Sequence, residues 1–249
     1  MNQPSTESFA SFDTAFQSGI QNYQAKNFEP AKLAFTKALE FEPDNPSALT
    51  NLALVQYQLG EKGWALALLR KAKTIDPNLP TTKSALNFIS TQMEVKEIPH
   101  EVKPWETLRN KAIEPFSLSF FIILTAGFLL SAGWTLLKYL GSRRRAFENN
   151  TALPSWPIPG LSLFLVFILS FLLMSLKFFD TQIPRATVVL TKVSALSQPD
   201  EKAPILFDLY SGLEIIINQT QNEWAQVTYP GGPTGWVQKS AISATTPGK

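Results

Sequence analysis

Two long apolar stretches without a charged residue occupy the middle of the chain, from Phe116 to Leu137 and from Ile158 to Leu176. A helix of about 20 mostly apolar residues is long enough to cross the roughly 30 Å hydrocarbon core of a bilayer. The core helix of a soluble domain would carry a polar face, and neither stretch has one. The sequence therefore predicts two transmembrane helices, residues 116–137 and 158–176, joined by a basic loop, residues 138–157.

This loop contains Arg143, Arg144 and Arg145 together with Lys138, and only Glu148 opposes their charge. The arginines either bind an anionic partner or set the orientation of the spans. A nucleic-acid site needs a broad basic surface, whereas the chain has 22 basic and 20 acidic residues, so no nucleic-acid partner is expected. Short loops rich in Lys and Arg stay in the cytoplasm. The three arginines are therefore predicted to be a topology signal, with some contact to anionic lipid headgroups.

An even number of spans places both ends of the chain on one side of the membrane. With the basic loop in the cytoplasm, both soluble parts are expected on the opposite side of the membrane. The first residues, Met1 to Phe16, lack the basic and apolar regions of a signal peptide. Either a segment precedes the residues given, or the orientation is reversed.

An internal repeat occupies the region before the spans. Residues 22–46 (NYQAKNFEPAKLAFTKALEFEPDNP) align with residues 56–80 (QYQLGEKGWALALLRKAKTIDPNLP) at a constant offset. This period and pattern resemble the tetratricopeptide repeat, a helix–turn–helix unit of about 34 residues. Gly60 suits the turn of the second unit, where the first unit has Lys26. The matched pairs are Tyr23 and Tyr57, Ala31 and Ala65, Phe35 and Leu69, Ala38 and Ala72, and Pro43 and Pro77.

Two such units leave an apolar face, so the apolar residues at helical spacing in residues 81–95 predict a capping helix. An all-α repeat domain over residues 9–96 is therefore expected. In the repeat family the first helices line a groove, and the carboxylate clamp of that groove is not matched here, because Ile20 and Leu54 replace polar residues. The groove either binds a peptide segment or only packs internally. The candidate partner-binding residues are Phe16, Ile20, Tyr23, Thr50, Leu54, Tyr57 and Phe88.

After a linker of residues 97–115 and the two spans, the pattern changes to alternating β-branched and aromatic residues over residues 185–243. About five short strands in this length predict a small all-β barrel. The order of motifs resembles the bacterial SH3-like domain. Trp224 and Trp236 are expected to pack inside the barrel, and "ILFDLY" (residues 205–210) is not expected to bind Pro-rich peptides. The residues that carry the resemblance are Val193, Pro199, Leu209, Gly212, Trp224, Val227, Gly232, Gly235, Trp236 and Val237.

No catalytic set of side chains is visible. The chain has no Cys and one His, His100, and it contains none of the common nucleophile, phosphate-loop or zinc motifs. The uncharged spans argue against a transporter, because intramembrane ionisable groups mark ion paths. We therefore expect no enzyme activity, no cofactor and no metal.

The order of the parts, namely repeats, two spans and an SH3-like domain, is similar to that of BatE-type proteins of bacterial aerotolerance operons. The resemblance implies a non-catalytic adaptor in a bacterial inner-membrane assembly with von Willebrand factor A-type partners, with both soluble domains in the periplasm and the Arg-rich loop in the cytoplasm. The alternative hypothesis is a membrane-anchored module that binds the cell wall through the SH3-like domain, since relatives of that domain bind peptidoglycan. The sequence as a whole predicts a multidomain membrane protein of three parts: an all-α repeat domain, a two-helix transmembrane hairpin and an all-β barrel.

Overall fold

The computed structural model describes residues 9–93 and 107–246. The chain divides into two compact units, one formed by Met1–Lys103 with Ile183–Lys249 and the other by Pro104–Gln182. Most of the predicted linker, with Trp105 and His100, and the last residues of the predicted repeat domain lie outside the described residues.

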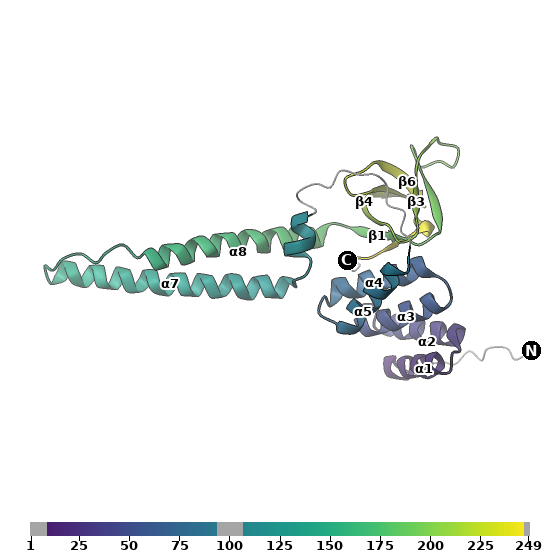
Figure 1. The fold of residues 1–249 in the computed structure, drawn as a ribbon, viewed down its shortest axis with the longest axis horizontal. Helices are drawn as coiled ribbons and strands as arrows, with labels where there is room; N and C mark the ends of the chain where they lie inside the picture. The colour runs from purple at the N-terminus through teal and green to yellow at the C-terminus, as the bar shows by residue number, and fades with distance from the viewer. Residues whose placement is uncertain (1–8, 94–106, 247–249) are drawn as a thin grey trace, which may run out of the picture. The chain divides into compact units, whose positions relative to one another are not determined.

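Five helices form the first part of the first unit (Figure 1). The third helix starts and ends at residues 46 and 58, and the first at 12 and 24. The fourth starts and ends at residues 62 and 75, and the second at 28 and 41, so the offset is the same at all four bounds. The structure thus has the period seen in the sequence, as two consecutive helix–turn–helix units followed by one more helix. The helices are α1 (Phe12–Gln24), α2 (Phe28–Phe41), α3 (Pro46–Gln58), α4 (Lys62–Ile75) and α5 (Pro80–Thr91).

Local signals explain where these helices begin. Ser11 caps α1 through a reciprocal capping box with Thr14. The side chain of Asn45 accepts hydrogen bonds from the backbone N–H groups of Ser47 and Ala48, both at 3.0 Å. Pro46 stands at the first position of α3, where no N–H donor is needed. Each helical unit is therefore delimited by its own sequence.

Small residues let the helices approach closely around two apolar clusters. A Cβ built on Gly19 would lie 2.6 Å from the ring of Phe35, so only glycine fits against this fully buried side chain. The helix α5 packs on the second helix–turn–helix unit and buries Ile89 completely. One cluster comprises Ala31, Phe35, Leu52 and Val55, and the other comprises Ala53, Ala65, Leu66, Leu69, Ala85 and Ile89.

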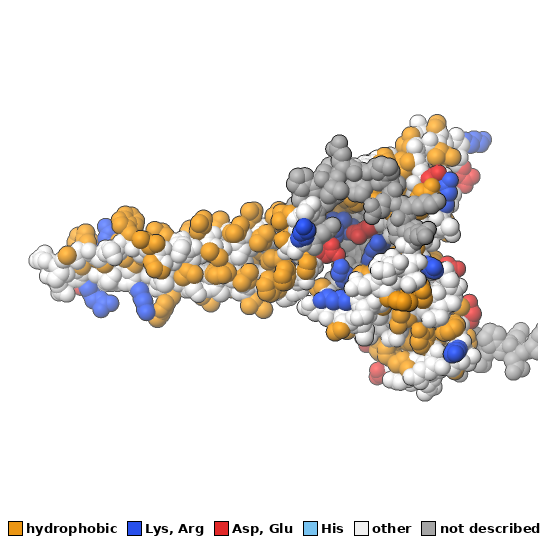
Figure 2. Space-filling view, viewed as in Figure 1, with side chains coloured by type: hydrophobic (Ala, Val, Ile, Leu, Met, Phe, Trp, Pro, Cys, Tyr) orange, Lys and Arg blue, Asp and Glu red, His pale blue; other side chains and the backbone are white. Residues whose placement is uncertain are grey.

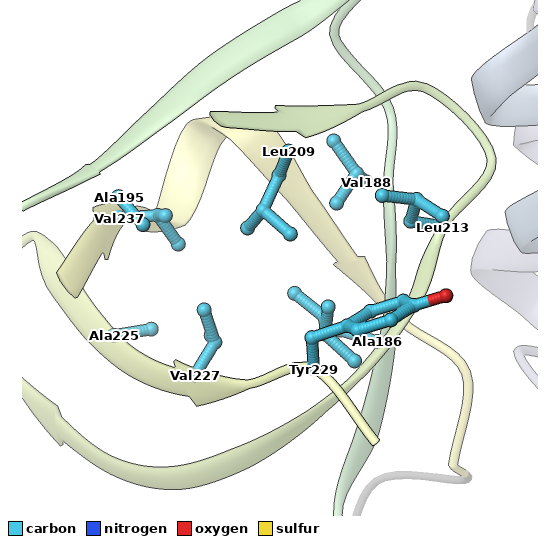
Figure 3. Close-up of a cluster of buried hydrophobic side chains, with 10 residues drawn as sticks. Ala186, Val188, Ala195, Leu209, Leu213, Ala225, Val227, Tyr229 and Val237 are labelled. Atoms are coloured by element: carbon cyan, nitrogen blue, oxygen red, sulfur yellow. The ribbon is translucent and has the colours of Figure 1, made fainter. Parts of the chain in front are cut away.

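The rest of the first unit is a small β domain whose seven strands pair in the order β3-β2-β6-β5-β4-β1-β7, all antiparallel. The strands curl around a core that includes Leu209, Val227 and Val237, all fully buried (Figure 3). The strands are β1 (Arg185–Val188), β2 (Lys192–Leu196), β3 (Ile205–Tyr210), β4 (Glu214–Gln221), β5 (Trp224–Thr228), β6 (Thr234–Gln238) and β7 (Ile242–Ala244).

The expected number of about five strands was therefore too low. The run from Ala186 to Leu196 looks continuous in sequence but is broken, because the backbone N–H of Val189 bonds to the carbonyl of Ala241 and the chain then turns into β2. A short 3-10 turn, Lys239–Ala241, precedes the seventh strand. Both features depend on contacts with distant residues, which a local pattern does not contain.

The second unit contains the two apolar helices, α7 (Leu118–Glu148) and α8 (Ile158–Gln182). Figure 2 shows apolar side chains along the length of this hairpin. In the most apolar part of α7 only 17% of the residues are buried, and in that of α8 only 11%, so these are not core helices covered by their own domain. Both are long and apolar enough to cross a membrane. The two helices pack closely where Gly160 faces the side chain of Thr135.

Residues just before α7 fold against the end of α8. Arg109–Ile113 form a short π-helix in the part predicted as linker. The Arg109 Nε atom lies 2.9 Å from Asp180 Oδ1, and the two side chains are only 16% and 8% exposed. Lys177 donates a hydrogen bond to the carbonyl of Ile113 at 3.2 Å. The segment before the first apolar helix is thus attached to the last turns of the second.

Candidate functional site

The predicted groove residues of the first helix are half-buried and pack internally. Phe16, Ile20 and Tyr23 all lie against the cluster around Phe35. The Phe16 ring stands edge-on to the Phe35 ring at 5.6 Å between centroids. These side chains contribute to the packing between helices, and only their outer edges are accessible.

The groove residues of the second helix–turn–helix unit, Leu54 and Tyr57, are half-buried as well, whereas Phe88 on α5 is exposed. Leu54 and Tyr57 pack partly against the cluster around Leu69. Tyr57 also contacts Phe88 edge-on, at 5.7 Å between ring centroids, and Phe88 is 52% exposed. The structure therefore brings Tyr57 and Phe88 together, from α3 and α5, as an accessible aromatic pair.

Thr50 is a structural residue rather than part of an accessible surface. Its side chain is 3% exposed and donates a hydrogen bond to the Pro46 carbonyl at 2.7 Å. Its hydroxyl also lies 2.7 Å from that of Thr82 on α5. Both hydroxyl groups are buried and satisfy one another, which links α3 to α5. The sequence predicts Thr50 as a partner-binding residue of the groove. In the structure its side chain makes only internal contacts and does not belong to the accessible surface.

A hollow of about 600 Å³ lies on the β domain, between the loop after β2 and the ends of β5 and β6. Its aromatic wall is the half-buried Trp224. Three carboxylates and one lysine surround it, so its charge is predominantly negative. We refer to it as the Trp224 hollow. Its lining residues are Pro199, Asp200, Glu201, Lys202, Glu223, Trp224, Gln238 and Ser240.

Two hydrogen bonds hold the loop that forms one wall of this hollow. The Lys202 N–H donates to Asp200 Oδ1 at 3.0 Å. The Gln238 side chain on β6 donates to Glu201 Oε1 at 3.3 Å, which ties the loop to the sheet. The Trp224 hollow therefore has a defined shape, while its carboxylates remain at the surface.

The two tryptophans of the β domain differ in burial. Trp236 is 7% exposed, as expected for a residue that packs the barrel. The sequence predicts the same role for Trp224, but this residue is only partly buried and lines the hollow. Its indole is thus packed against the domain on one side and accessible from the hollow on the other.

Residues 205–210, the "ILFDLY" stretch, form β3. On this strand Asp208 lies 2.7 Å from Lys192 Nζ and accepts a hydrogen bond from the Ser194 hydroxyl at 2.8 Å. The Lys192 ammonium, followed by the Ser194 hydroxyl, lowers the pKa of the Asp208 carboxyl. The hydrogen bond to Asp208 raises the pKa of Lys192. This charged group pairs β2 with β3 at the surface of the sheet.

The three arginines lie on the last turns of α7 and not in a loop, because that helix continues to Glu148. Each has a neighbour on the same helix. Arg144 forms an ion pair with Glu148 at 2.9 Å, and the Arg145 Nε atom donates to the Gly141 carbonyl at 3.3 Å. Arg143 lies over the Phe147 ring, 5.8 Å from its centre. All three are exposed side chains on a helix that extends past the apolar stretch.

Among residues 9–93 and 107–246, no three His, Cys, Asp or Glu side chains gather in a way that could hold a metal ion. The sequence pattern does not indicate the Trp224 hollow, although Trp224 and Pro199 both belong to the SH3-like motif pattern. Its carboxylates come from separate loops, and only folding brings them together.

The geometry of the β domain defines its class: a small antiparallel sheet curled around one apolar core, with a long loop between β2 and β3 and a 3-10 turn before the last strand. Residues 191–244 match the family model of the bacterial SH3 domain. The match spans β2 to β7 and confirms the SH3-like prediction for this part of the chain.

Proposed function

We propose that the protein is a non-catalytic adaptor anchored in the bacterial inner membrane by α7 and α8. Its N-terminal helices act as a tetratricopeptide repeat domain that binds a partner protein, and its SH3 domain supplies a second contact. The observation that carries the proposal is that the chain combines two small domains with an apolar hairpin whose residues are mostly not buried.

The repeat interpretation is supported by the constant spacing of the helix bounds and by the close approach of Gly19 to Phe35. The resemblance to BatE-type proteins suggests von Willebrand factor A-type membrane proteins of the same operon as partners, in a stress-tolerance assembly. The accessible pair Tyr57 and Phe88 is the best candidate contact, since aromatic side chains contribute strongly at the centres of interfaces.

Co-purification of the full-length protein from membranes tests this role. Phe88→Ala should reduce the recovery of the partner, because it removes a half-exposed aromatic side chain of the candidate contact. The buried clusters should stay intact, since Phe88 is not part of them. The matched control is Leu33→Ala, which removes a similarly exposed apolar side chain from α2. Leu54→Asp and Tyr57→Ala should have larger effects, provided that helical content is unchanged. Equal recovery with Phe88→Ala and Leu33→Ala would argue against this surface.

A second candidate function is binding of the cell wall, since a bacterial SH3 domain is commonly a cell-wall binding module. The Trp224 hollow favours it, because an indole face beside several carboxylates suits a peptide or glycan ligand that carries an amine. In co-sedimentation of the detergent-solubilised protein with purified sacculi, Trp224→Ala should weaken binding. Trp156→Ala, at an exposed tryptophan in the hairpin turn, should not. No retention of the wild type above a control protein would exclude this function.

A further inference from the structure

The helix α4 buries residues on two opposite sides. On one side Ala65 and Leu69 belong to the apolar cluster shared with α3 and α5. Residues two positions away on a helix point about 200° around the axis. On that other side, Gly63 is buried, Ala67 is 1% exposed and the Arg70 side chain is 24% exposed. We call Gly63, Ala67 and Arg70 the outer face of α4.

The first repeat unit provides an internal comparison. The positions one repeat period before the outer face of α4 are Glu29, Leu33 and Thr36, on α2. All three are exposed. The equivalent helix side is therefore open to solvent in the first helix–turn–helix unit and covered in the second. Another segment of the protein must pack on the outer face of α4.

The first strand of the SH3 domain shows the complementary pattern. On β1, Ala186 and Val188 belong to the apolar core of the domain. Side chains alternate between the two faces of a strand, so Thr187 between them points away from that core. Thr187 is nevertheless completely buried. A part of the protein outside the SH3 core therefore covers this side of β1.

The two covered surfaces meet each other. Arg70 donates a hydrogen bond to the Thr187 hydroxyl at 2.7 Å, and its Nε atom lies 4.0 Å from Glu214 Oε2. Arg185 lies on the other oxygen of Glu214, at 3.4 Å. A Cβ built on Gly63 would overlap the Ser211 hydroxyl and the Val189 carbonyl, so the helix backbone packs directly on the turns next to β1.

We infer that the outer face of α4 is a docking surface for the SH3 domain of the same chain, in which Gly63 permits the close approach and Arg70 contacts Thr187 and Glu214 at the edge of the interface. This goes beyond the adaptor function, in which the two domains could act as separate modules. The docked residues of the SH3 domain, Thr187, Val189, Ser211 and Glu214, are different from those that line the Trp224 hollow. Docking therefore uses one side of the SH3 domain and keeps the hollow for a ligand.

Docking also determines a property of the membrane topology. Arg70 precedes both apolar helices in the chain, and Thr187 follows both. Direct contact between them requires that the chain return to its original side, so α7 and α8 cross the membrane together as a hairpin or not at all. Both soluble domains then face the same compartment, whichever compartment that is.

The absence of cysteine from the chain allows a clean crosslinking test on the full-length protein in membranes. Arg70→Cys combined with Glu214→Cys should yield an intramolecular species with a short bis-maleimide, detected by its altered gel mobility and by mass spectrometry. The matched control is Thr36→Cys with Glu214→Cys, which places the first thiol at the equivalent exposed position of the first repeat. This pair should give no such species.

A second variant tests whether the close approach at Gly63 is needed. Adding Gly63→Leu to the Arg70→Cys and Glu214→Cys pair should abolish the crosslink, because the side chain would overlap the Val189 carbonyl. Adding Glu29→Leu, one repeat earlier, should leave it intact. Circular dichroism should show equal helical content in both. Crosslinking equal to that of the Thr36→Cys control, or unaffected by Gly63→Leu, would overturn the inference. Partner recovery is measured separately, so failure of the adaptor function would not be confused with failure of docking.

Discussion

Lys26 and Gly60 occupy the same turn of two successive helical units, and both have a left-handed backbone, with φ of 61° and 86°. Glycine adopts this conformation without steric cost, whereas a residue with a Cβ does not. The turn is therefore imposed by the packing of the flanking helices, and the first unit accepts lysine at some expense of stability.

Lys26→Gly should consequently stabilise the helical domain, by about 0.5–1 kcal/mol after the greater freedom of glycine in the unfolded chain is counted. Gly60→Ala should destabilise it by about 1 kcal/mol, because alanine would be forced into the left-handed region. Urea unfolding followed by far-ultraviolet circular dichroism measures both. If the two changes moved the midpoint in the same direction, the shared turn geometry would not be the determining factor.

Lys26 and Gly60 also show which parts of the fold the sequence pattern predicts. The constant period predicted both units, although Lys26 does not fit the glycine pattern, because many other positions agree. The burial of Thr50 could not be predicted, since it depends on Thr82 in a helix outside the repeat alignment. The Trp224 hollow likewise requires loops that meet only in the folded domain.

The sequence predicts a loop from residue 138, whereas α7 continues to Glu148. A change from apolar to charged residues at Lys138 marks the end of a membrane-spanning stretch but not the end of a helix. The structural end comes at Asn149 and Asn150, and Asn150 has a left-handed backbone with φ of 50°. Asparagine is one of the few residues with a side chain that take this conformation readily. The local stop signal was therefore present in the sequence, at the pair of asparagines.

The exposed arginines on this helical extension should determine which side of the membrane it faces. Arg143→Glu, Arg144→Glu and Arg145→Glu together should disturb the orientation of the hairpin, because short segments rich in Lys and Arg are retained in the cytoplasm. Protease protection in spheroplasts, together with reporter fusions after Asn150, measures this. Replacing all three arginines by lysine preserves the charge and should preserve the orientation. An unchanged protection pattern in the glutamate variant would show that the signal lies elsewhere.

The ion pair between Arg109 and Asp180 should stabilise the compact unit that contains α7 and α8, Pro104–Gln182. Asp180→Ala leaves the guanidinium of Arg109 largely buried, and removal of one partner of a buried pair costs about 3–5 kcal/mol. We expect the lower end of this range, because Glu114 remains 3.9 Å from Arg109. Thermal unfolding in detergent should show a reduced melting temperature. The double variant Arg109→Leu with Asp180→Ala should recover much of it, and failure to recover would point to a packing role for Asp180 instead.

The surface pair of Asp208 and Lys192 should make the stability of the SH3 domain depend on pH. The pKa of Asp208 is lowered from its ordinary value of 3.8, chiefly by Lys192 and then by Ser194, so its contribution is present above that value. The contribution is lost as the pH falls through the lower pKa of the folded state. The pKa of Lys192 is raised from 10.5 by Asp208, so its part is present below 10.5 and is lost only as the pH rises through the higher folded value.

Between these limits the full contribution of the pair to stability is present. Variants of Lys192 and Ser194 can separate the two causes of the lowered pKa of Asp208. Lys192→Met should reduce the acid sensitivity of unfolding more than Ser194→Ala, because the ammonium lowers the pKa of Asp208 more than the hydroxyl does. Asp208→Asn should abolish this component at both ends. Denaturation midpoints of the full-length protein in detergent, measured from about pH 2 to pH 7, test the acid limb, where the carboxyl titrates. If Ser194→Ala had the larger effect, the hydroxyl would be the main stabiliser of the Asp208 carboxylate, and the ion pair at 2.7 Å would contribute little.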